Sequence, residues 1–337
     1  MKKKTFIIAE LSANHNGDIQ VALETIRAAK RTGADAVKIQ TYTPDTLTID
    51  CENDYFKINH GTAWDGEYLY DLYKRAFTPW DWHAKIFKVA KEEGIICFSS
   101  PFDNTAVDLL EELGAPIYKI ASFEIQDIPL IEYVASKGKP MILSTGIAEI
   151  SDIELAIETC RKVGNNDITI LKCTSAYPAD PADANLITIP DIKKKFNVKA
   201  GLSDHTLGIE GPVVATVLGA TVIEKHFILD KSIGGPDAHF SLDEKEFTDM
   251  VKAVRNAEEM IGKVDYEMTE KKKKSRQFSR SLFVVEDVKK GDLITKDNVR
   301  SIRPGFGMHP KFYKEIISKT FSSDINRGVP LNKNMIK

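Results

Sequence analysis

Residues 198–227, VKAGLSDHTLGIEGPVVATVLGATVIEKHF, decide the fold of this 337-residue chain. Two short apolar runs each end in polar residues that include a histidine, and a helix-like segment at 211–219 separates the runs. A strand, a helix and a second strand in this order predict a parallel βαβ unit. His205 and His226, which end the two strands, are then expected side by side at one edge of the sheet.

The same pattern extends upstream through most of the chain. Apolar runs that end in polar residues begin with FIIAEL and continue as AVKIQ, IICF, IYKI, MIL and ITIL. Helical segments are predicted between and after them at 19–31, 80–93, 104–113, 128–136, 151–163, 185–195 and 243–261. Eight such units predict an α/β fold, a (β/α)8 TIM barrel whose active site lies at the carboxyl ends of the strands. The long connection 42–79, rich in aromatic and polar residues, predicts an ordered insertion over the barrel mouth.

The chain is longer than one barrel needs, since such barrels take about 250 residues. We expect the barrel to occupy residues 1–264 and a lysine-rich linker to follow at 265–276. Residues 277–337 contain short apolar runs between turn signals and predict a small β-rich module. A module of this size buries little core alone and is expected to dock on the barrel or on a second subunit.

Composition limits the classes of partner. A net charge of −3 provides no broad basic surface for nucleic acid. No stretch approaches the roughly 20 apolar residues of a membrane span, and MKKK leads directly into the first strand without the pattern of a signal peptide. We therefore expect a cytoplasmic protein with small-molecule partners. The four cysteines form no CxxC pair and are expected as reduced thiols.

The two histidines are candidate metal ligands. Imidazoles at the ends of neighbouring strands bind a divalent ion and leave positions open for water and substrate, as a catalytic ion requires. The alternative is that His205 and His226 only form hydrogen bonds inside the barrel rim.

Lysines near the strand ends indicate an anionic ligand, because a lysine is costly to bury without a counter-charge. Lys38 and Lys119 are placed in the site, whereas alternation along TVIEKHF turns Lys225 toward the helices. Hydroxyls that fit a phosphate follow at neighbouring strand ends, namely Ser122, Ser144 and Ser203.

Three carboxylates complete the candidates from the residues themselves. Glu10 ends the first strand and Glu124 follows the fourth, and both are candidates for proton transfer or metal contact. The alternative for Glu124 is a solvated carboxylate on the rim. Asp237 lies on a glycine-rich loop that is long enough to fold over the mouth.

Ten motifs in order resemble the sialic acid synthase family over nearly the whole chain. They are EL-x-x-NH-x-G at 10–17, K-x-Q at 38–40, SSPF at 99–102, YKIAS-x-E at 118–124, LSTG at 143–146, LKCTSAYP at 171–178, LSDHT at 202–206, EKHF at 224–227, GPD at 235–237 and RPGFG at 303–307. The C-terminal module is similar to the antifreeze-like (SAF, β-clip) domain of that family. Within the family, the segment 60–83 is similar to members that make pseudaminic acid. Ser175 stands where the N-acetylneuraminate enzymes carry asparagine, which fits a different sugar.

The resemblance implies a transferase that condenses phosphoenolpyruvate with an open-chain amino sugar and water, releasing phosphate by C–O cleavage. His205 and His226 would hold Mn²⁺ or Mg²⁺, or Co²⁺. The implied phosphoenolpyruvate ligands are Lys38, Ser100, Lys119, Ser122, Ser144 and Ser203. The implied catalytic carboxylates are Glu10 and Glu124.

For the sugar, the resemblance implies contacts from Gln40, Phe102, Tyr177, Asp237 and Arg303. It also implies a domain-swapped homodimer, in which Arg303 of the antifreeze-like domain reaches the partner's barrel. The alternatives within the family are N-acetylneuraminate or legionaminate synthesis. Outside the family they are a Schiff-base aldolase with Lys119 as nucleophile and a non-enzymatic sugar-binding protein.

Overall fold

The protein, seen here as a computed structural model, is described over residues 4–59 and 64–337. It divides into two compact units, Met1–Gly262 and Lys263–Lys337, and each is described by itself. The expectations for the first three residues of the MKKK start and for the first four residues of the segment 60–83 fall outside the described residues.

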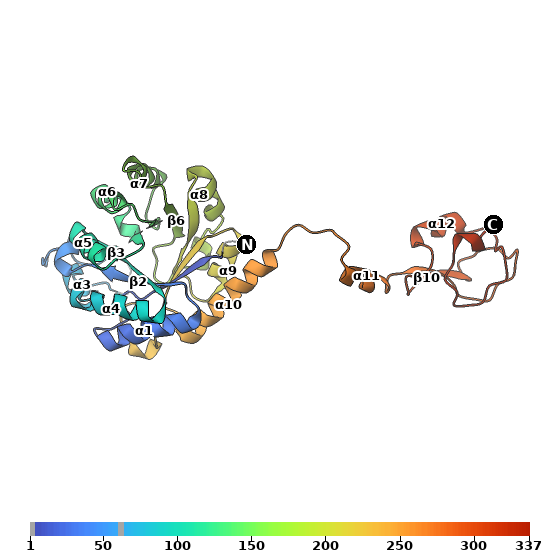
Figure 1. Ribbon diagram of the computed structural model, residues 1–337, viewed down its shortest axis with the longest axis horizontal. Coiled ribbons are helices and arrows are strands. Elements are labelled where there is room, and N and C mark those ends of the chain that lie inside the picture. The colour runs from blue at the N-terminus through green and yellow to red at the C-terminus, as the bar shows by residue number, and fades with distance from the viewer. Residues whose placement is uncertain (1–3, 60–63) are drawn as a thin grey trace. The chain divides into compact units, whose positions relative to one another are not determined.

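Eight parallel strands of the first unit close into a barrel in which each strand pairs with the next and β8 returns to β1 (Figure 1). This confirms the predicted TIM barrel. The strands are β1 (Phe6–Glu10), β2 (Ala36–Thr41), β3 (Ile96–Pro101), β4 (Tyr118–Ile120), β5 (Met141–Ser144), β6 (Ile168–Cys173), β7 (Lys199–Asp204) and β8 (Val222–His226).

Helices surround this barrel on its outside (Figure 1). They are α1 (Ile19–Thr32), α4 (Trp80–Glu93), α5 (Asn104–Glu112), α6 (Ile128–Ser136), α7 (Ile150–Lys162), α8 (Thr188–Phe196), α9 (Glu210–Val217) and α10 (Glu244–Ile261). The helix predicted to begin at residue 185 begins at Thr188. Asn185 has φ of 44°, a left-handed conformation that an α-helix cannot include.

The barrel interior becomes more polar over two residues in six of the strands, β1, β2, β3, β5, β6 and β8. One buried cluster inside the barrel contains Ile8, Ala36, Phe98, Ile142, Leu171 and Val222. Side chains two positions apart share a face of a strand. The next inward residues are Glu10, Lys38, Ser100, Ser144, Cys173 and Glu224, which places a polar layer directly above an apolar floor.

The insertion between β2 and α4 is ordered where it is described. It contains α2 (Pro44–Leu47) and α3 (Leu69–Ala76), and an antiparallel bridge joins Lys57 to Tyr68. Leu72 is the buried residue of α3. Trp80 Nε1 donates a hydrogen bond to the carbonyl of Tyr42 at 3.1 Å. These contacts hold the insertion at the end of β2.

The second unit has its own small core. An antiparallel pair, β9 (Ser281–Val284) and β10 (Val299–Ile302), is followed by α12 (Tyr313–Ile316). Leu282, Val284, Val299 and Leu331 are fully buried in that core. The segment expected as a linker contains a short helix, α11 (Glu270–Arg276), whose side chains are all exposed. The Thr269 side chain caps it by accepting a hydrogen bond from the backbone N–H of Lys272, a local device that needs no apolar face.

Cys97, Cys160 and Cys173 are buried free thiols, and Cys51 is free and half-buried. None of the helices in the described ranges combines the length and apolar character needed to cross a membrane.

Candidate active site

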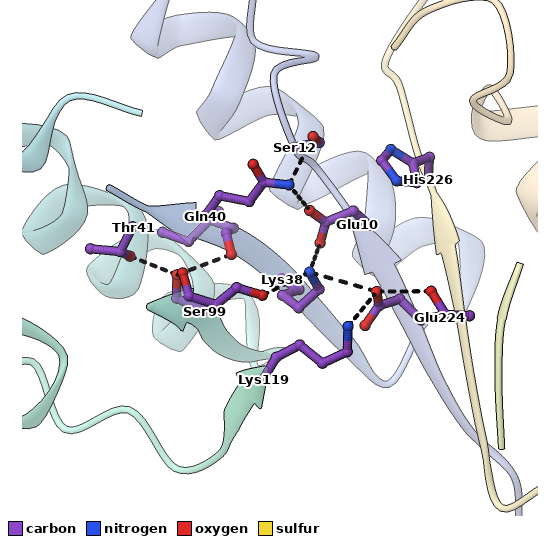
Figure 2. Close-up of polar contacts among 12 residues, drawn as sticks. Glu10, Ser12, Lys38, Gln40, Thr41, Ser99, Lys119, Glu224 and His226 are labelled. Atoms are coloured by element: carbon purple, nitrogen blue, oxygen red, sulfur yellow. Dashed lines mark hydrogen bonds and ion pairs between the residues drawn. The ribbon is translucent and has the colours of Figure 1, made fainter. Parts of the chain in front are cut away.

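Lys38 is the centre of a buried polar network at the carboxyl ends of β1, β2, β3 and β8 (Figure 2). Its Nζ lies 2.8 Å from Glu10 Oε2 and 3.6 Å from Glu224 Oε1, and it donates a hydrogen bond to Ser100 Oγ at 3.2 Å. Lys38 is 3% exposed and Glu10 is 1% exposed. Lys38 is therefore buried among strand ends, as predicted. The negative charges beside it are those of Glu10 and Glu224, which belong to the protein itself.

Lys119 reaches the same network from β4. Its Nζ lies 3.3 Å from Glu224 Oε1, which also accepts a hydrogen bond from Ser203 Oγ at 3.4 Å. One carboxylate oxygen of Glu224 thus receives both lysines and a serine. Its other oxygen, Oε2, is buried and has no hydrogen-bond partner.

Burial and mutual charge act against each other in this network. Burial works against the charged form of Lys38, but the charges of Glu10 and Glu224 outweigh it and raise its pKa. Burial lowers the pKa of Lys119, and the charge of Glu224 opposes that effect. Burial opposes ionisation of Glu224 as well, yet Lys119 and Lys38 together lower its pKa. The site therefore offers two ammonium groups whose charge depends on nearby carboxylates.

The two histidines are close together, as predicted from the position of His205 directly after β7 and of His226 at the end of β8. Their ring centroids are 5.3 Å apart. Tyr177 packs 4.4 Å from the His205 ring, and Phe240 packs 4.8 Å from the His226 ring. Both histidine rings therefore pack against the same two aromatic side chains, Tyr177 and Phe240.

Hydrogen bonds define the free nitrogen of His205. Its Nδ1 lies 2.9 Å from the carbonyl oxygen of Thr174, which can only accept, so Nδ1 carries a proton and Nε2 is available. Burial opposes the charged form of His205, but contact with Cys173 Sγ, 3.8 Å from Nδ1, raises its pKa.

His226 is a neutral, partly unsatisfied imidazole. Its pKa is well below the ordinary value because of burial and of the neighbouring positive charges. Its Nδ1 is buried without a hydrogen-bond partner, and Asp237 Oδ2 is 3.8 Å away. A buried nitrogen without a partner is costly unless a ligand satisfies it.

This donor set fits a catalytic divalent ion better than a structural one. Within residues 4–59 and 64–337, no group of three or more His, Cys, Asp or Glu side chains is arranged to hold a metal. Two imidazole nitrogens would leave most coordination positions for water and substrate, which is typical of a catalytic site.

The expected phosphate hydroxyls are buried around the same mouth. Ser144 Oγ has no hydrogen-bond partner, and neither does the nearby Ser175 Oγ. Ser122 Oγ accepts a hydrogen bond from the backbone N–H of Gly146 at 3.1 Å. A side chain at Gly146 would place its Cβ 1.9 Å from Ser175 Oγ, so only glycine leaves room there. Ser122, Ser144 and Ser175 therefore form a cluster of hydroxyl groups around Gly146 in which two of the three oxygens have no protein partner.

Glu124 lies in the short 3₁₀ turn Ser122–Glu124 that follows β4. Burial raises its pKa to about 7, and its Oε2 has no hydrogen-bond partner. A carboxyl that titrates near neutral pH without a fixed partner has the properties of a general base.

The outer layer of the mouth contains the remaining barrel candidates. Gln40 Nε2 donates to Glu10 Oε1 and to Ser12 Oγ, both at 3.1 Å (Figure 2). Phe102 packs on Tyr42 with ring centroids 5.2 Å apart, and Tyr42 meets Tyr73 of α3 at 5.8 Å. The insertion therefore supplies part of an aromatic wall.

Two residues from the sequence analysis remain. Arg303 belongs to the second unit, where its side chain is exposed. Lys225 points away from the mouth, where its Nζ lies 2.5 Å from Asp204 Oδ2 and 2.6 Å from the Thr206 carbonyl. Its exclusion from the site agrees with the alternation of β8.

Sequence reasoning missed two residues of this site. Glu224 is two residues before His226 in β8, and the alternation that excluded Lys225 already placed it inside the barrel. Phe240, which packs against both histidines, lies in the loop after β8. No periodicity in that loop could indicate where its ring points.

Comparison with known proteins gives a consistent family. Residues 25–266 match the NeuB family, and residues 279–337 match the SAF domain. The chain is 50% identical over 331 residues to a pseudaminic acid synthase of Campylobacter jejuni, covering 98% of this chain and 96% of that protein. It is 48% identical over 332 residues to a pseudaminic acid synthase of Helicobacter pylori, covering 98% and 97%.

A solved structure has a similar fold over most of the chain. The crystal structure of N-acetylneuraminic acid (sialic acid) synthetase from Leptospira borgpetersenii serovar Hardjo-bovis, in complex with citrate, superposes with a TM-score of 0.72. It is 32% identical, and the match covers 81% of this chain and 90% of that chain. The two pseudaminic acid synthases match this chain over nearly its whole length, which includes both the residues that match the NeuB family and those that match the SAF domain.

Proposed function

This chain belongs to the NeuB family, and from that premise we propose that it makes pseudaminic acid. The reaction condenses phosphoenolpyruvate with 2,4-diacetamido-2,4,6-trideoxy-β-L-altropyranose and water, and releases phosphate. The observation that carries the proposal is the convergence of Lys38, Lys119 and unpartnered buried hydroxyls beside two neighbouring imidazoles. The lysines and hydroxyls suit the anionic enol phosphate, and a metal ion at the two imidazoles would suit the oxygen of the aldehyde.

Charge complementarity supports the place of phosphoenolpyruvate. Its carboxylate and phosphate are both anionic and suit ammonium and hydroxyl donors. Lys38, Ser100 and Lys119 receive the carboxylate end. Ser122, Ser144 and Ser203 receive the phosphate, and Ser144 Oγ is free to donate because no protein group accepts from it.

A divalent ion, Mn²⁺ or Mg²⁺ or Co²⁺, would be held by His205 and His226 and would supply Lewis-acid polarisation of the aldehyde oxygen. The protein's own contribution is to keep both imidazoles in the required form. The Thr174 carbonyl fixes the tautomer of His205, and burial keeps His226 neutral.

The condensation divides into bond changes that balance. The double bond of the enol supplies the electron pair for the new C–C bond between its carbon three and the aldehyde carbon, which leaves an oxocarbenium at carbon two. Water adds at carbon two, and Glu124 accepts one of its two protons. This proton is then passed to the alkoxide formed from the aldehyde oxygen. The hydroxyl at carbon two becomes the carbonyl of the product as phosphate leaves with its bridging oxygen and the second proton of the water, which is C–O cleavage. Glu10, 2.8 Å from Lys38, lies beside the reacting carbons and orients that lysine.

The sugar occupies the outer layer of the mouth in this proposal. Gln40 and Asp237 offer polar contacts, whereas Tyr177 and Phe102 offer aromatic faces. A 6-deoxy sugar has a methyl group where other sugars have a hydroxyl, and an aromatic surface suits a methyl group. Arg303 would reach the sugar from the second unit of a partner chain in a domain-swapped homodimer.

Phosphate release from phosphoenolpyruvate tests the proposal with three sugars in parallel. They are the diacetamido-trideoxy altrose, its mannose-configured analogue and N-acetylmannosamine. We expect the highest kcat/KM with the altrose sugar. Preference for the mannose-configured analogue would indicate legionaminate synthesis, and preference for N-acetylmannosamine would indicate N-acetylneuraminate synthesis.

One observation favours a second chemistry, because burial lowers the pKa of Lys119 toward that of a nucleophilic amine. Its ion pair with Glu224 acts in the opposite sense. Borohydride reduction in the presence of pyruvate separates the two. Covalent labelling of Lys119 would establish a Schiff-base aldolase, and absence of labelling together with loss of activity on chelation is expected for the proposed synthase.

A further inference from the structure

We propose that Glu224 is a positioning residue for the enol phosphate, which keeps Lys38 and Lys119 charged and correctly placed before the ligand arrives. The inference rests on the proposed function, since it concerns the same anion site. It is not obvious from chemistry alone, because a carboxylate inside a site for a highly anionic ligand repels that ligand.

The geometry makes Glu224 the shared counter-ion of both lysines (Figure 2). Its Oε1 lies 3.3 Å from Lys119 Nζ and 3.6 Å from Lys38 Nζ, and its side chain is 5% exposed. Glu10 is the closer partner of Lys38, at 2.8 Å. Over residues 4–59 and 64–337, however, Glu224 is the one carboxylate within ion-pair distance of Lys119.

The energetic reason is the cost of burying charge. An ammonium group in a protein interior loses several kcal/mol of solvation unless a counter-charge compensates it. Lys119 is 2% exposed, so without Glu224 its neutral form would gain population in the empty site. A neutral amine offers a phosphate or carboxylate no charge-assisted hydrogen bond.

The arrangement also leaves Glu224 able to release the lysines. Its contacts with Lys119 and Ser203 are long, at 3.3 and 3.4 Å, and its Oε2 makes no hydrogen bond. Donors that share one oxygen at these distances are loosely held. The incoming anion can therefore replace Glu224 as their acceptor without breaking a short, well-aligned pair.

Two effects of Glu224 predict opposite results for Glu224→Gln. If the carboxylate only repels the ligand, removing its charge tightens phosphoenolpyruvate binding. If it maintains the lysines, removing its charge weakens binding, and most strongly at alkaline pH. The charged or titratable groups that face Lys119 are Glu224, Lys38, Cys173, Glu10 and Glu124. Among these groups, Glu224 raises the pKa of Lys119 most.

The matched control is Asp204→Asn. Asp204 is also a buried carboxylate paired with a lysine, and it lies on the neighbouring strand with its partner Lys225 on β8. This pair faces the opposite side of the strands from the mouth. The variant reports the general effect of losing a buried negative charge at this place in the barrel.

The experiment measures binding of phosphoenolpyruvate to the full chain by calorimetry between pH 7 and pH 10, and then KM for both substrates. We expect Glu224→Gln to weaken phosphoenolpyruvate binding about 10–100-fold, to move the alkaline loss of binding to lower pH, and to leave the sugar KM within about twofold. Asp204→Asn should keep the parent's affinity and pH profile while lowering thermal stability.

A second variant, Glu224→Asp, separates the effect of the charge from that of its position. It also keeps the proposal testable if Glu224→Gln does not fold. Glu224→Asp keeps the charge, so it should retain the parent's alkaline profile with weaker binding. Tighter binding by Glu224→Gln, or an unchanged alkaline profile in it, would overturn the proposal. Direct binding also distinguishes the two levels of inference: if the parent binds phosphoenolpyruvate but turns over none of the three sugars, the proposed function fails while the role of Glu224 is still measured.

Discussion

Replacing Glu124 by glutamine should remove activity and at the same time stabilise the barrel at alkaline pH. Glutamine keeps the shape of the side chain and cannot ionise. Burial raises the pKa of Glu124 from 4.5 to about 7, so the folded protein binds this proton more tightly than the unfolded chain does. Stability linked to Glu124 is therefore fully present below about pH 4.5 and is lost as the pH rises to about 7.

The size of the effect follows from the displacement of the pKa. Each pKa unit corresponds to about 1.4 kcal/mol, so a change from 4.5 to about 7 corresponds to about 3 kcal/mol at pH 8. The side chain is partly exposed, and solvent screening reduces this to about 2–3 kcal/mol. Glu124→Gln should recover this energy at pH 8 and much less of it at pH 5.

Tryptophan fluorescence makes the measurement specific for the barrel. The chain has three tryptophans, Trp64, Trp80 and Trp82, and all belong to the first unit. Urea unfolding of parent and variant at pH 5 and pH 8 should show a stability difference that widens by about 2 kcal/mol between the two pH values. A difference that is the same at both pH values, or a variant less stable than the parent at pH 8, would refute the reasoning.

Turnover completes the test of Glu124 as the base. In the parent, kcat/KM should rise with pH through about 7 as the carboxyl ionises. In the glutamine variant, kcat should fall by about 10²–10⁴-fold. A stabilised variant that retains activity would leave the burial argument intact and remove Glu124 from the chemistry.

Three further variants probe the other parts of the site. His226→Ala should abolish turnover while the circular dichroism spectrum persists, because it removes one of two imidazoles at the mouth; near-normal turnover would exclude this residue from the chemistry. Arg303→Ala should raise the KM of the sugar and leave that of phosphoenolpyruvate unchanged, and equal sugar kinetics would place Arg303 outside the site. Lys38→Met leaves Glu10 buried without its partner and should destabilise the barrel by about 3–5 kcal/mol, whereas the double variant with Glu10→Gln should recover most of that stability but no activity. If single and double variants unfold at the same urea concentration, the two charges are not coupled.

The barrel could be predicted because its signals are local. Most strands repeat the same short pattern, an apolar residue followed two positions later by a polar one, as in Ile8 and Glu10 or Val222 and Glu224. That period fixes which side chains enter the barrel, and strand order fixes which of them become neighbours. The helix before β7 was placed three residues too early, since its sequence does not reveal the left-handed Asn185.

Parts of the site depended on contacts between distant segments. The free nitrogen of His205 is determined by the hydrogen bond from Nδ1 to the carbonyl of Thr174. Every residue has a backbone carbonyl, so the residue type at position 174 could not indicate this contact. Phe240 reaches the histidines through the path of a loop. Glu224 could have been found, because the alternation used to exclude Lys225 applies equally to its neighbour.

The opposite orientations of Glu224 and Lys225 have a consequence for engineering this chain. Consecutive residues of β8 serve two separate charge systems, one in the mouth and one behind the strand with Asp204. Deleting a single residue within Val222–His226 would invert every later side chain of the strand. A deletion before Glu224 would turn Glu224 and His226 away from the barrel mouth and turn Lys225 toward it, next to Lys38 and Lys119. Redesign of substrate preference should therefore change residue types in this strand and confine changes of length to the loops.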